Sequence, residues 1–397
     1  MNFIFRTALL FGFVAIGGAQ NTIVVRGAVI HTAVGPPLSD ATIVVRDGKI
    51  EAVGKGIAIP AGAKVYDASG KTLVPGMIDE HSHIGAKPSD LNDRPMIIGP
   101  QHRILDALDL NDPDWAEALK GGVTTLITGP GSGENVSGQA IVIKTFGSDL
   151  AKRIVNEKGG MKFAMGPKSS DRYPATSMGV AANLRQYLIK TQEYMAGWKK
   201  WEEGDKKSPA PARDLGFEAM TDVLTKKQRV RAHVHSATDV MTLLRLKDEF
   251  GFDLVLHHST EAYKVAPEIA KRGVSAVVLP LGDRIGVTED AMEGPVILWK
   301  AGVRIAMHTD HPVIDEKWLR LSGALAMRYG LPEEEALKAL TINPAIIARV
   351  GDRVGSLEPG KDADFVVMNG PWYEPATRVD MVFGNGELLY DRSKEGK

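Results

Sequence analysis

The sequence predicts an α/β fold, a (β/α)8 TIM barrel with a small β-sandwich formed by the N- and C-terminal segments. Two observations predict it. Short apolar runs alternate with helical stretches over about 270 residues in the middle of the chain, and both ends are rich in β-branched residues. Alternating strands and helices are typical of a parallel sheet flanked by helices, and a closed barrel of eight strand-helix units has about this length.

Both ends of the chain carry β patterns. The runs 22–26 and 41–46 are rich in β-branched residues, and Asp47-Gly48 after the second run is a strong signal for a two-residue hairpin turn. A similar texture returns near the C-terminus, where a turn is expected at Gly384-Asn385-Gly386. Each end alone is too short for a good sheet, so we expect the two to pair.

These patterns divide the chain into a composite β-sandwich, residues 20–74 and 351–397, and a barrel over residues 75–350. Buried barrel strands are expected at Gly122–Ile127, Val230–Ala232, Phe252–Leu256, Val274–Val278 and Val303–Ala306.

The N-terminal segment, residues 1–19, differs from the rest. Arg6 precedes the apolar run 8–16, and small residues lead to a cleavage position after Ala19, as in secretory signal peptides. The run is shorter than the roughly 20 apolar residues that span a bilayer. We therefore expect a signal peptide and a periplasmic or secreted protein without stable membrane association. A retained tether, or a buried first strand in a cytoplasmic protein, is the alternative.

The composition limits the chemistry. The formal net charge is −1, so no long-range field favours nucleic acid or an anionic membrane. The sequence contains no cysteine, which excludes thiol nucleophiles, disulfides and thiolate metal ligands. We expect a small-molecule substrate and no nucleic-acid partner, and a homo-oligomer stays open.

Nine of the ten histidines lie between His81 and His311. His81 and His83 stand two residues apart at the end of an apolar run. On a strand, residues i and i+2 share one face, so both imidazoles can reach one metal ion. Taken alone, such a pair is more often two core histidines held by hydrogen bonds.

Three further candidate ligands directly follow later β-like runs: His233, His258 and Asp310. The carboxyl ends of barrel strands converge on one mouth, so these side chains would meet His81 and His83 there. Imidazole and carboxylate groups suit zinc and similar divalent ions. One metal site explains these positions better than five coincidences.

Short motifs recur along the whole chain after the N-terminal segment. They are Pro75-Gly76-Met77-Ile78-Asp79 before His81-x-His83, Gly122-Val123-Thr124-Thr125, His258-Ser259-Thr260-Glu261, Thr309-Asp310, Thr341-Ile342-Asn343-Pro344-Ala345 and Gly355-Ser356-Leu357-Glu358-Pro359-Gly360-Lys361-Asp362-Ala363-Asp364. In these motifs the sequence resembles the amidohydrolase superfamily, closest to its imidazolonepropionase-like branch. The resemblance implies a metal-dependent hydrolase. It is weakly specific for substrate, because the family acts on cyclic amides, N-acyl amino acids, dipeptides and related C–N bonds.

The resemblance also implies which residues bind metal. The first-strand histidines His81 and His83 and the last-strand Asp310 would bind one ion, and His233 and His258 would bind a second ion where two are present. We expect Zn²⁺, with Mn²⁺ or Fe²⁺ as alternatives.

A carboxylated lysine on the fourth strand commonly bridges the two ions in this superfamily, and Lys162 is the candidate here. A surface lysine at a strand end is the alternative, and Lys168 and Glu134 are weaker candidates for an anionic bridge. Mononuclear relatives carry a catalytic Glu three residues after the fifth-strand His, where this chain has Ser236. That difference favours two ions. Glu261 is expected to open a helix instead.

The expected activity is cleavage of a C–N bond in an amide, cyclic amide or peptide-like substrate by a metal-activated water. Asp310 would take the proton of that water and pass it to the leaving nitrogen. A mononuclear deaminase-type hydrolase, a lactonase and a non-catalytic metal-binding relative are the alternatives.

Three residues are candidates for substrate binding. His235 and His311 each stand beside a proposed ligand, and Arg172 is expected on a loop after the fourth strand. A packing role is the alternative for each histidine. His257 and His308 are expected to point away from the mouth, because neighbours on a strand face opposite sides.

Overall fold

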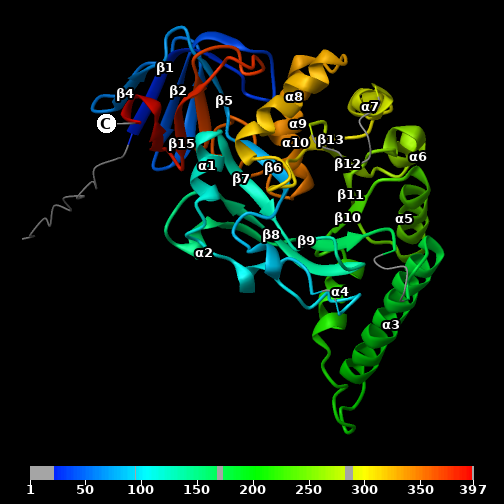
Figure 1. Cartoon of the computed structure of the whole chain (residues 1–397). Helices are drawn as coiled ribbons and strands as arrows, with labels where there is room; N and C mark the ends of the chain where they lie inside the picture. Colours follow the sequence, from blue (N-terminus) through cyan, green and yellow to red (C-terminus); the bar gives the residue numbers. More distant parts are fainter. Residues whose placement is uncertain (1–21, 94, 168–172, 282–288, 396–397) are drawn as a thin grey trace, which may run out of the picture.

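A computed structural model describes residues 22–93, 95–167, 173–281 and 289–395. Two eight-stranded sheets form its framework (Figure 1). The expected signal peptide lies outside the described residues. Within them, no helix combines the length and the apolar character needed to cross a membrane.

One sheet unites the two ends of the chain. Its strands run in the order β16–β15–β14–β5–β1–β2–β3, with β4 paired to β1. They are β1 (Thr22–Ile30), β2 (Leu38–Arg46), β3 (Lys49–Gly54), β4 (Lys64–Asp67), β5 (Thr72–Pro75), β14 (Phe365–Met368), β15 (Val379–Gly384) and β16 (Glu387–Asp391). Because β14 pairs antiparallel with β5, the predicted sandwich of both chain ends is confirmed.

Both predicted hairpin turns are present. Asp47 and Gly48, with φ of 49° and 80°, join β2 to β3, and Asn385 and Gly386, with φ of 46° and 75°, join β15 to β16. Positive φ at both central positions gives a turn whose twist matches that of the flanking strands.

The second sheet is the barrel, with the order β13–β12–β11–β10–β9–β8–β7–β6. Its strands are β6 (Met77–Ser82), β7 (Val123–Thr128), β8 (Val136–Lys144), β9 (Ile154–Ala164), β10 (Val230–Val234), β11 (Leu254–His258), β12 (Ser275–Val278) and β13 (Ile305–Met307). The ends meet just beyond β13, where the backbone N–H of Asp310 donates to the carbonyl of His81 at 3.1 Å. The (β/α)8 fold is therefore confirmed, and the predicted strands are present within two residues of their expected bounds.

One barrel strand departs from the parallel pattern. β8 runs antiparallel to both β7 and β9. The connections on either side of it, 129–135 and 145–153, contain only the one-turn helix α2 (Leu150–Arg153). Such short connections make hairpins, whereas a parallel pairing needs a crossover of a dozen or more residues.

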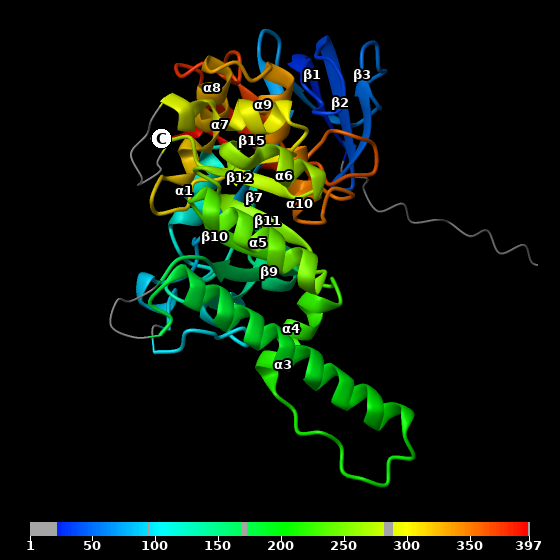
Figure 2. The same ribbon diagram turned by 90° about the vertical axis from the view of Figure 1, so that its right-hand side faces the viewer.

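Helices cover the outside of the barrel (Figures 1 and 2). They are α1 (Asp114–Lys120), α3 (Ser177–Glu203), α4 (Leu215–Leu224), α5 (Ala237–Phe250), α6 (Ala266–Lys271), α7 (Glu289–Lys300), α8 (Leu319–Arg328), α9 (Glu333–Leu340) and α10 (Ile342–Ile347). Short 3₁₀ helices are η1 (Pro88–Asp90), η2 (Ile104–Ala107), η3 (Ala262–Val265), η4 (Glu316–Trp318) and η5 (Arg392–Lys394). The far end of α3 and the exposed loop after it project from the body (Figure 2).

Candidate metal centre

The barrel brings the predicted ligands to the carboxyl ends of its parallel strands, where side chains from different strands meet. The five are His81 in β6, His83 just beyond it, His233 in β10, His258 at the end of β11 and Asp310 after β13. They fall into two groups of neighbouring ligand atoms.

The first group consists of His81, His83 and Asp310, whose ligand atoms all lie within 4.8 Å of one another. The Asp310 Oδ1 atom lies 3.2 Å from the Nε2 atom of His81 and 3.4 Å from that of His83. The Nδ1 atom of His83 lies 2.7 Å from the carbonyl oxygen of Gly129. Because a carbonyl only accepts, Nδ1 carries the proton and Nε2 of neutral His83 keeps its lone pair for a metal ion.

Lys162, on β9, lies beside this first group. Its Nζ atom is 2.8 Å from the Nε2 atom of His81, and the residue is only 3% exposed. The surface-lysine alternative is therefore wrong. Burial, and then the neighbouring Lys162, lowers the pKa of His81 well below its usual range. The neutral imidazole favoured in this way is the form that binds metal.

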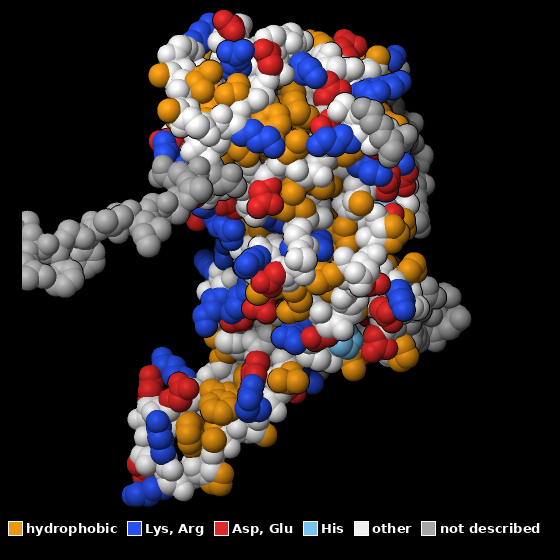
Figure 3. Space-filling view, turned by 90° about the vertical axis from the view of Figure 1, so that its left-hand side faces the viewer, with side chains coloured by type: hydrophobic (Ala, Val, Ile, Leu, Met, Phe, Trp, Pro, Cys, Tyr) orange, Lys and Arg blue, Asp and Glu red, His pale blue; other side chains and the backbone are white. Residues whose placement is uncertain are grey.

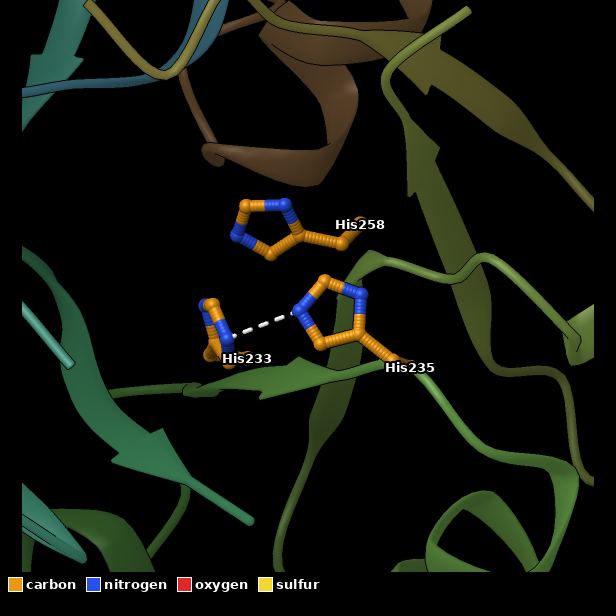
Figure 4. A group of neighbouring side chains, drawn as sticks. All are labelled: His233, His235 and His258. Atoms are coloured by element: carbon orange, nitrogen blue, oxygen red, sulfur yellow. Dashed lines mark hydrogen bonds between the residues drawn. The ribbon is translucent and has the colours of Figure 1, made fainter. Parts of the chain in front are cut away.

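The second group consists of His233, His235 and His258, whose ligand atoms also lie within 4.8 Å of one another. Figure 4 shows the three rings beside one another, with the Nε2 atoms of His233 and His235 joined at 3.0 Å. The rings of His233 and His258 have centroids 4.1 Å apart. Among the described residues, the buried Nε2 atom of His258 has no hydrogen-bond partner. Such an orphaned nitrogen fits a ligand position.

The backbone is strained where these strands end. His258, Ser259 and Asp310 have φ of 63°, 56° and 53°, in the left-handed region that residues other than glycine rarely adopt. Each such residue costs on the order of 1–3 kcal/mol, and this strain persists where the surrounding structure enforces it. Here it occurs at two proposed ligands.

A cavity of about 450 Å³ opens over both groups. Five side chains from the two groups line it: His83, His233, His235, His258 and Asp310. The other lining residues are Leu91, Asn92, Gly131, Ser132, Leu279, Pro312 and Val313. Its size and mixed lining suit a small molecule.

His257 and His308 are not among the described residues that line this cavity. Both are fully buried, and their ring centroids lie 4.9 and 5.5 Å from that of His81. They pack beneath the proposed ligands, as their expected orientation away from the mouth implies.

The three residues predicted to bind substrate lie in different places. His235 lines the cavity, and its ligand atom lies among those of His233 and His258, which are proposed to bind metal. The Nε2 atom of His311 lies 3.0 Å from the Oδ2 atom of Asp114 on α1, and His311 is not among the described lining residues. Arg172 lies outside the described residues.

The mononuclear alternative needs a catalytic carboxylate, and the two positions considered for it, Ser236 and Glu261, have other roles in the structure. Ser236 caps α5, its hydroxyl accepting the backbone N–H of Asp239 at 3.1 Å. The carboxylate of Glu261 accepts the backbone N–H of Ala237 at 3.0 Å and the Lys264 ammonium at 2.7 Å. As expected, Glu261 stands at the start of a helix, η3.

Asp79 is a site residue that sequence reasoning missed, although it lies in the motif before His81. It accepts hydrogen bonds from the backbone N–H groups of His81, a proposed ligand, and Thr309, which precedes the proposed ligand Asp310. Burial raises its pKa to about 6, and burial together with Asp79 raises the pKa of Glu316 well above its usual range. Burial and the neighbouring Asp79 carboxyl group therefore both favour the protonated form of Glu316.

Comparisons with known proteins relate this chain to one family. A model described as the amidohydrolase family matches residues 72–389. The crystal structure of an amidohydrolase from Thermotoga maritima MSB8 is 37% identical, covers 93% of this chain and all of its own, and superposes with a TM-score of 0.87.

Two curated relatives extend the comparison. Amidohydrolase tasK of Hapsidospora irregularis is 29% identical over 78% of this chain, which spans only 35% of that longer protein. The imidazolonepropionase of Thermoplasma volcanium is 24% identical over 91% of this chain and 93% of its own length.

Proposed function

Because this chain belongs to the amidohydrolase family, in its imidazolonepropionase-like branch, it is a metal-dependent hydrolase of carbon–nitrogen bonds, and we propose that it uses two divalent metal ions. The observation that carries this proposal is the presence of two separate groups of ligand atoms under one cavity. A mononuclear enzyme would need only one of them.

The proposed ligands of the first ion are His81, His83 and Asp310, and those of the second ion include His233 and His258. Lys162, once carboxylated, would offer one oxygen to each ion. Its burial beside His81 supports this role, because desolvation favours the neutral amine that reacts with CO₂. Nitrogen and oxygen ligands without thiolate suit Zn²⁺, with Mn²⁺ or Fe²⁺ as alternatives.

Divalent ions held by these residues would acidify water and polarise the substrate carbonyl. Asp310 accepts the proton of the attacking water and returns it to the nitrogen that leaves when the C–N bond breaks, so that water is added across this bond. Burial alone would raise the pKa of Asp310, but in the absence of metal His81 and His83 lower this pKa well below the usual range when their Nε2 atoms carry a proton. The carboxylate is thus ionised and able to accept.

The cavity lining supports a substrate with both polar and apolar parts. Leu91, Leu279 and Val313 offer apolar contacts, and Asn92 and Ser132 offer polar ones. Acidic and basic side chains are interspersed over the face in Figure 3, which supports a small molecule rather than a polyanion as partner. Amides, cyclic amides and dipeptides are the classes to test, with lactones as the alternative.

We also propose that the chain is exported to the periplasm or medium, which the pattern of residues 1–19 supports. For the domain bounds, we propose a sandwich of residues 20–74 and 351–397 and a barrel of residues 75–350. The mass of the mature protein from an exporting host tests the first proposal, and limited proteolysis tests the domain bounds.

The test of the proposed function is metal content measured together with turnover. Protein produced with zinc or manganese and bicarbonate should hold two metal equivalents, hydrolyse a member of a panel of dipeptides, N-acyl amino acids, cyclic amides and lactones, and lose this activity on chelation. Hydrolysis that survives complete metal removal, or a fully active enzyme with one equivalent, would overturn the proposal.

A further inference from the structure

The second ligand group contains one imidazole more than the proposed function needs. His235 lies at the end of β10, two residues after His233, and the two ring centroids are 4.7 Å apart. The ring of His235 also lies 4.9 Å from that of His258. All three residues line the cavity, so a ligand that enters it meets the group as a whole.

The orientation of His235 resembles that of a metal ligand. Its Nδ1 atom lies 2.8 Å from the hydroxyl oxygen of Thr260, and its Nε2 atom is turned toward His233. His83 is arranged similarly, with Nδ1 on the carbonyl of Gly129 and Nε2 facing Asp310. Ligating histidines are typically fixed through their other ring nitrogen in this way.

The distances also fit one ion. With Zn–N bonds of about 2.0–2.1 Å, two nitrogen ligands of a tetrahedral zinc lie roughly 3.3 Å apart. The Nε2 atoms of His233 and His235 are separated by 3.0 Å, so a small movement brings both into position. His258 adds a buried Nε2 atom without a partner among the described residues. Three imidazoles that leave a fourth position open toward a cavity are a known catalytic zinc arrangement.

Lys162 contacts the other group. Its Nζ atom lies 2.8 Å from His81, which is a proposed ligand of the first ion. We infer that His235 is the third protein ligand of the second ion, so that three imidazoles suffice to hold this ion, and an oxygen from a carboxylated Lys162 would be an additional ligand that the ion can lose without being released. The inference rests on the proposed two-ion function. The ligand class is a divalent ion that accepts nitrogen donors, such as Zn²⁺ or Co²⁺.

The experiment measures bound metal rather than activity. Three proteins are equilibrated with Zn²⁺ at increasing chelator concentrations: wild type, His235→Ala and Lys162→Met. The bound metal equivalents are then measured by inductively coupled plasma mass spectrometry. We expect wild type and Lys162→Met to hold two equivalents. We expect His235→Ala to hold one tightly, and a second at least about 100-fold more weakly, since loss of a ligand exceeds the roughly 10–100-fold effect of losing a supporting contact.

Two further variants separate ligation from packing. Thr260→Val removes the hydroxyl that orients His235 and should weaken the second ion by about 10–100-fold while leaving the fold intact. His311→Ala is the matched control, because His311 also stands beside a proposed ligand but binds Asp114. It should keep both ions. Co²⁺ absorption should change in His235→Ala and not in His311→Ala.

Two results would overturn the inference. One is a His235→Ala variant with two ions at wild-type affinity, and the other is a Lys162→Met variant that loses its second ion. Wild-type protein that never holds more than one ion contradicts the proposed function itself, so the two failures are distinguishable.

Discussion

The carboxylate of Asp79 accepts both the backbone N–H and the hydroxyl of Thr309, at 2.8 and 2.6 Å. Its other oxygen accepts the backbone N–H of His81 at 2.8 Å. One buried side chain therefore joins the first and last barrel strands beside His81 and Asp310, two proposed ligands of the first ion. The spacing of these ligands depends on a residue that need not touch the metal.

Replacement of Asp79 by Asn tests this dependence. The amide nitrogen cannot accept, so at least one of the N–H donors of His81 and Thr309 is left facing another donor. We expect the first ion to bind about 10–100-fold more weakly in a chelator competition, as is typical when a supporting contact is lost. Thr309→Val removes only the hydroxyl donor and should have a smaller effect. Wild-type affinity in Asp79→Asn would contradict the role.

Asp310→Asn tests the proton-transfer role. The amide keeps a metal-binding oxygen but has lost the basic carboxylate, so the variant should retain bound metal while kcat falls by about 10²–10⁴-fold, the usual range for a general acid-base group. Metal analysis and steady-state rates on the same sample check both halves. Turnover close to wild type would exclude Asp310 as the proton acceptor.

The sequence predicted what depends on local pattern. The strand-end positions of His81, His83, His233, His258 and Asp310 follow from short apolar runs, and both hairpin turns follow from residue pairs that favour positive φ. The grouping of His235 with the ligands had a local signal as well, because His233-x-His235 repeats the spacing of the first pair.

Contacts between residues far apart in the chain could not be predicted from local sequence patterns. The contact of Asp79 with Thr309 joins residues 230 positions apart, and no local pattern encodes it. Burial of Lys162 against His81 is likewise a product of barrel closure, which is why a surface position remained open from sequence alone. The antiparallel direction of β8 follows from the short connections on either side of it. The general alternation of strands and helices predicted a parallel strand there instead.

We expect the ion pairs of Lys144 to stabilise the contact between the barrel and the sandwich. The ammonium of this buried residue, at the end of β8, lies 2.8 Å from Asp362 and 3.0 Å from Asp364, beside β14. Lys144→Met leaves the buried carboxylate of Asp364 without its cation, while Asp362 keeps Lys49 and Arg353, and it should lower the free energy of unfolding by about 3–5 kcal/mol.

Lys158→Met is the matched control for this measurement. Lys158 pairs with Asp222 at 2.6 Å, but its side chain is 48% exposed. Solvent screens such a pair, so its loss should cost about 1 kcal/mol or less. Urea unfolding compares the two variants. Equal effects would show that the buried contact contributes no more than a surface ion pair.

The same contact predicts a pH dependence. Burial opposes ionisation of Asp362, but the nearby Lys144, with help from Lys49, holds its pKa at about 2. The unfolded chain has an Asp pKa of about 3.9, so the stabilisation is present above that pH and is lost as pH falls toward 2. It amounts to roughly 2.6 kcal/mol, at about 1.4 kcal/mol per pKa unit. The difference in unfolding free energy between wild type and Asp362→Asn should therefore shrink between pH 5 and 2. A difference that stays constant over this range would show that Asp362 is not held ionised by Lys144.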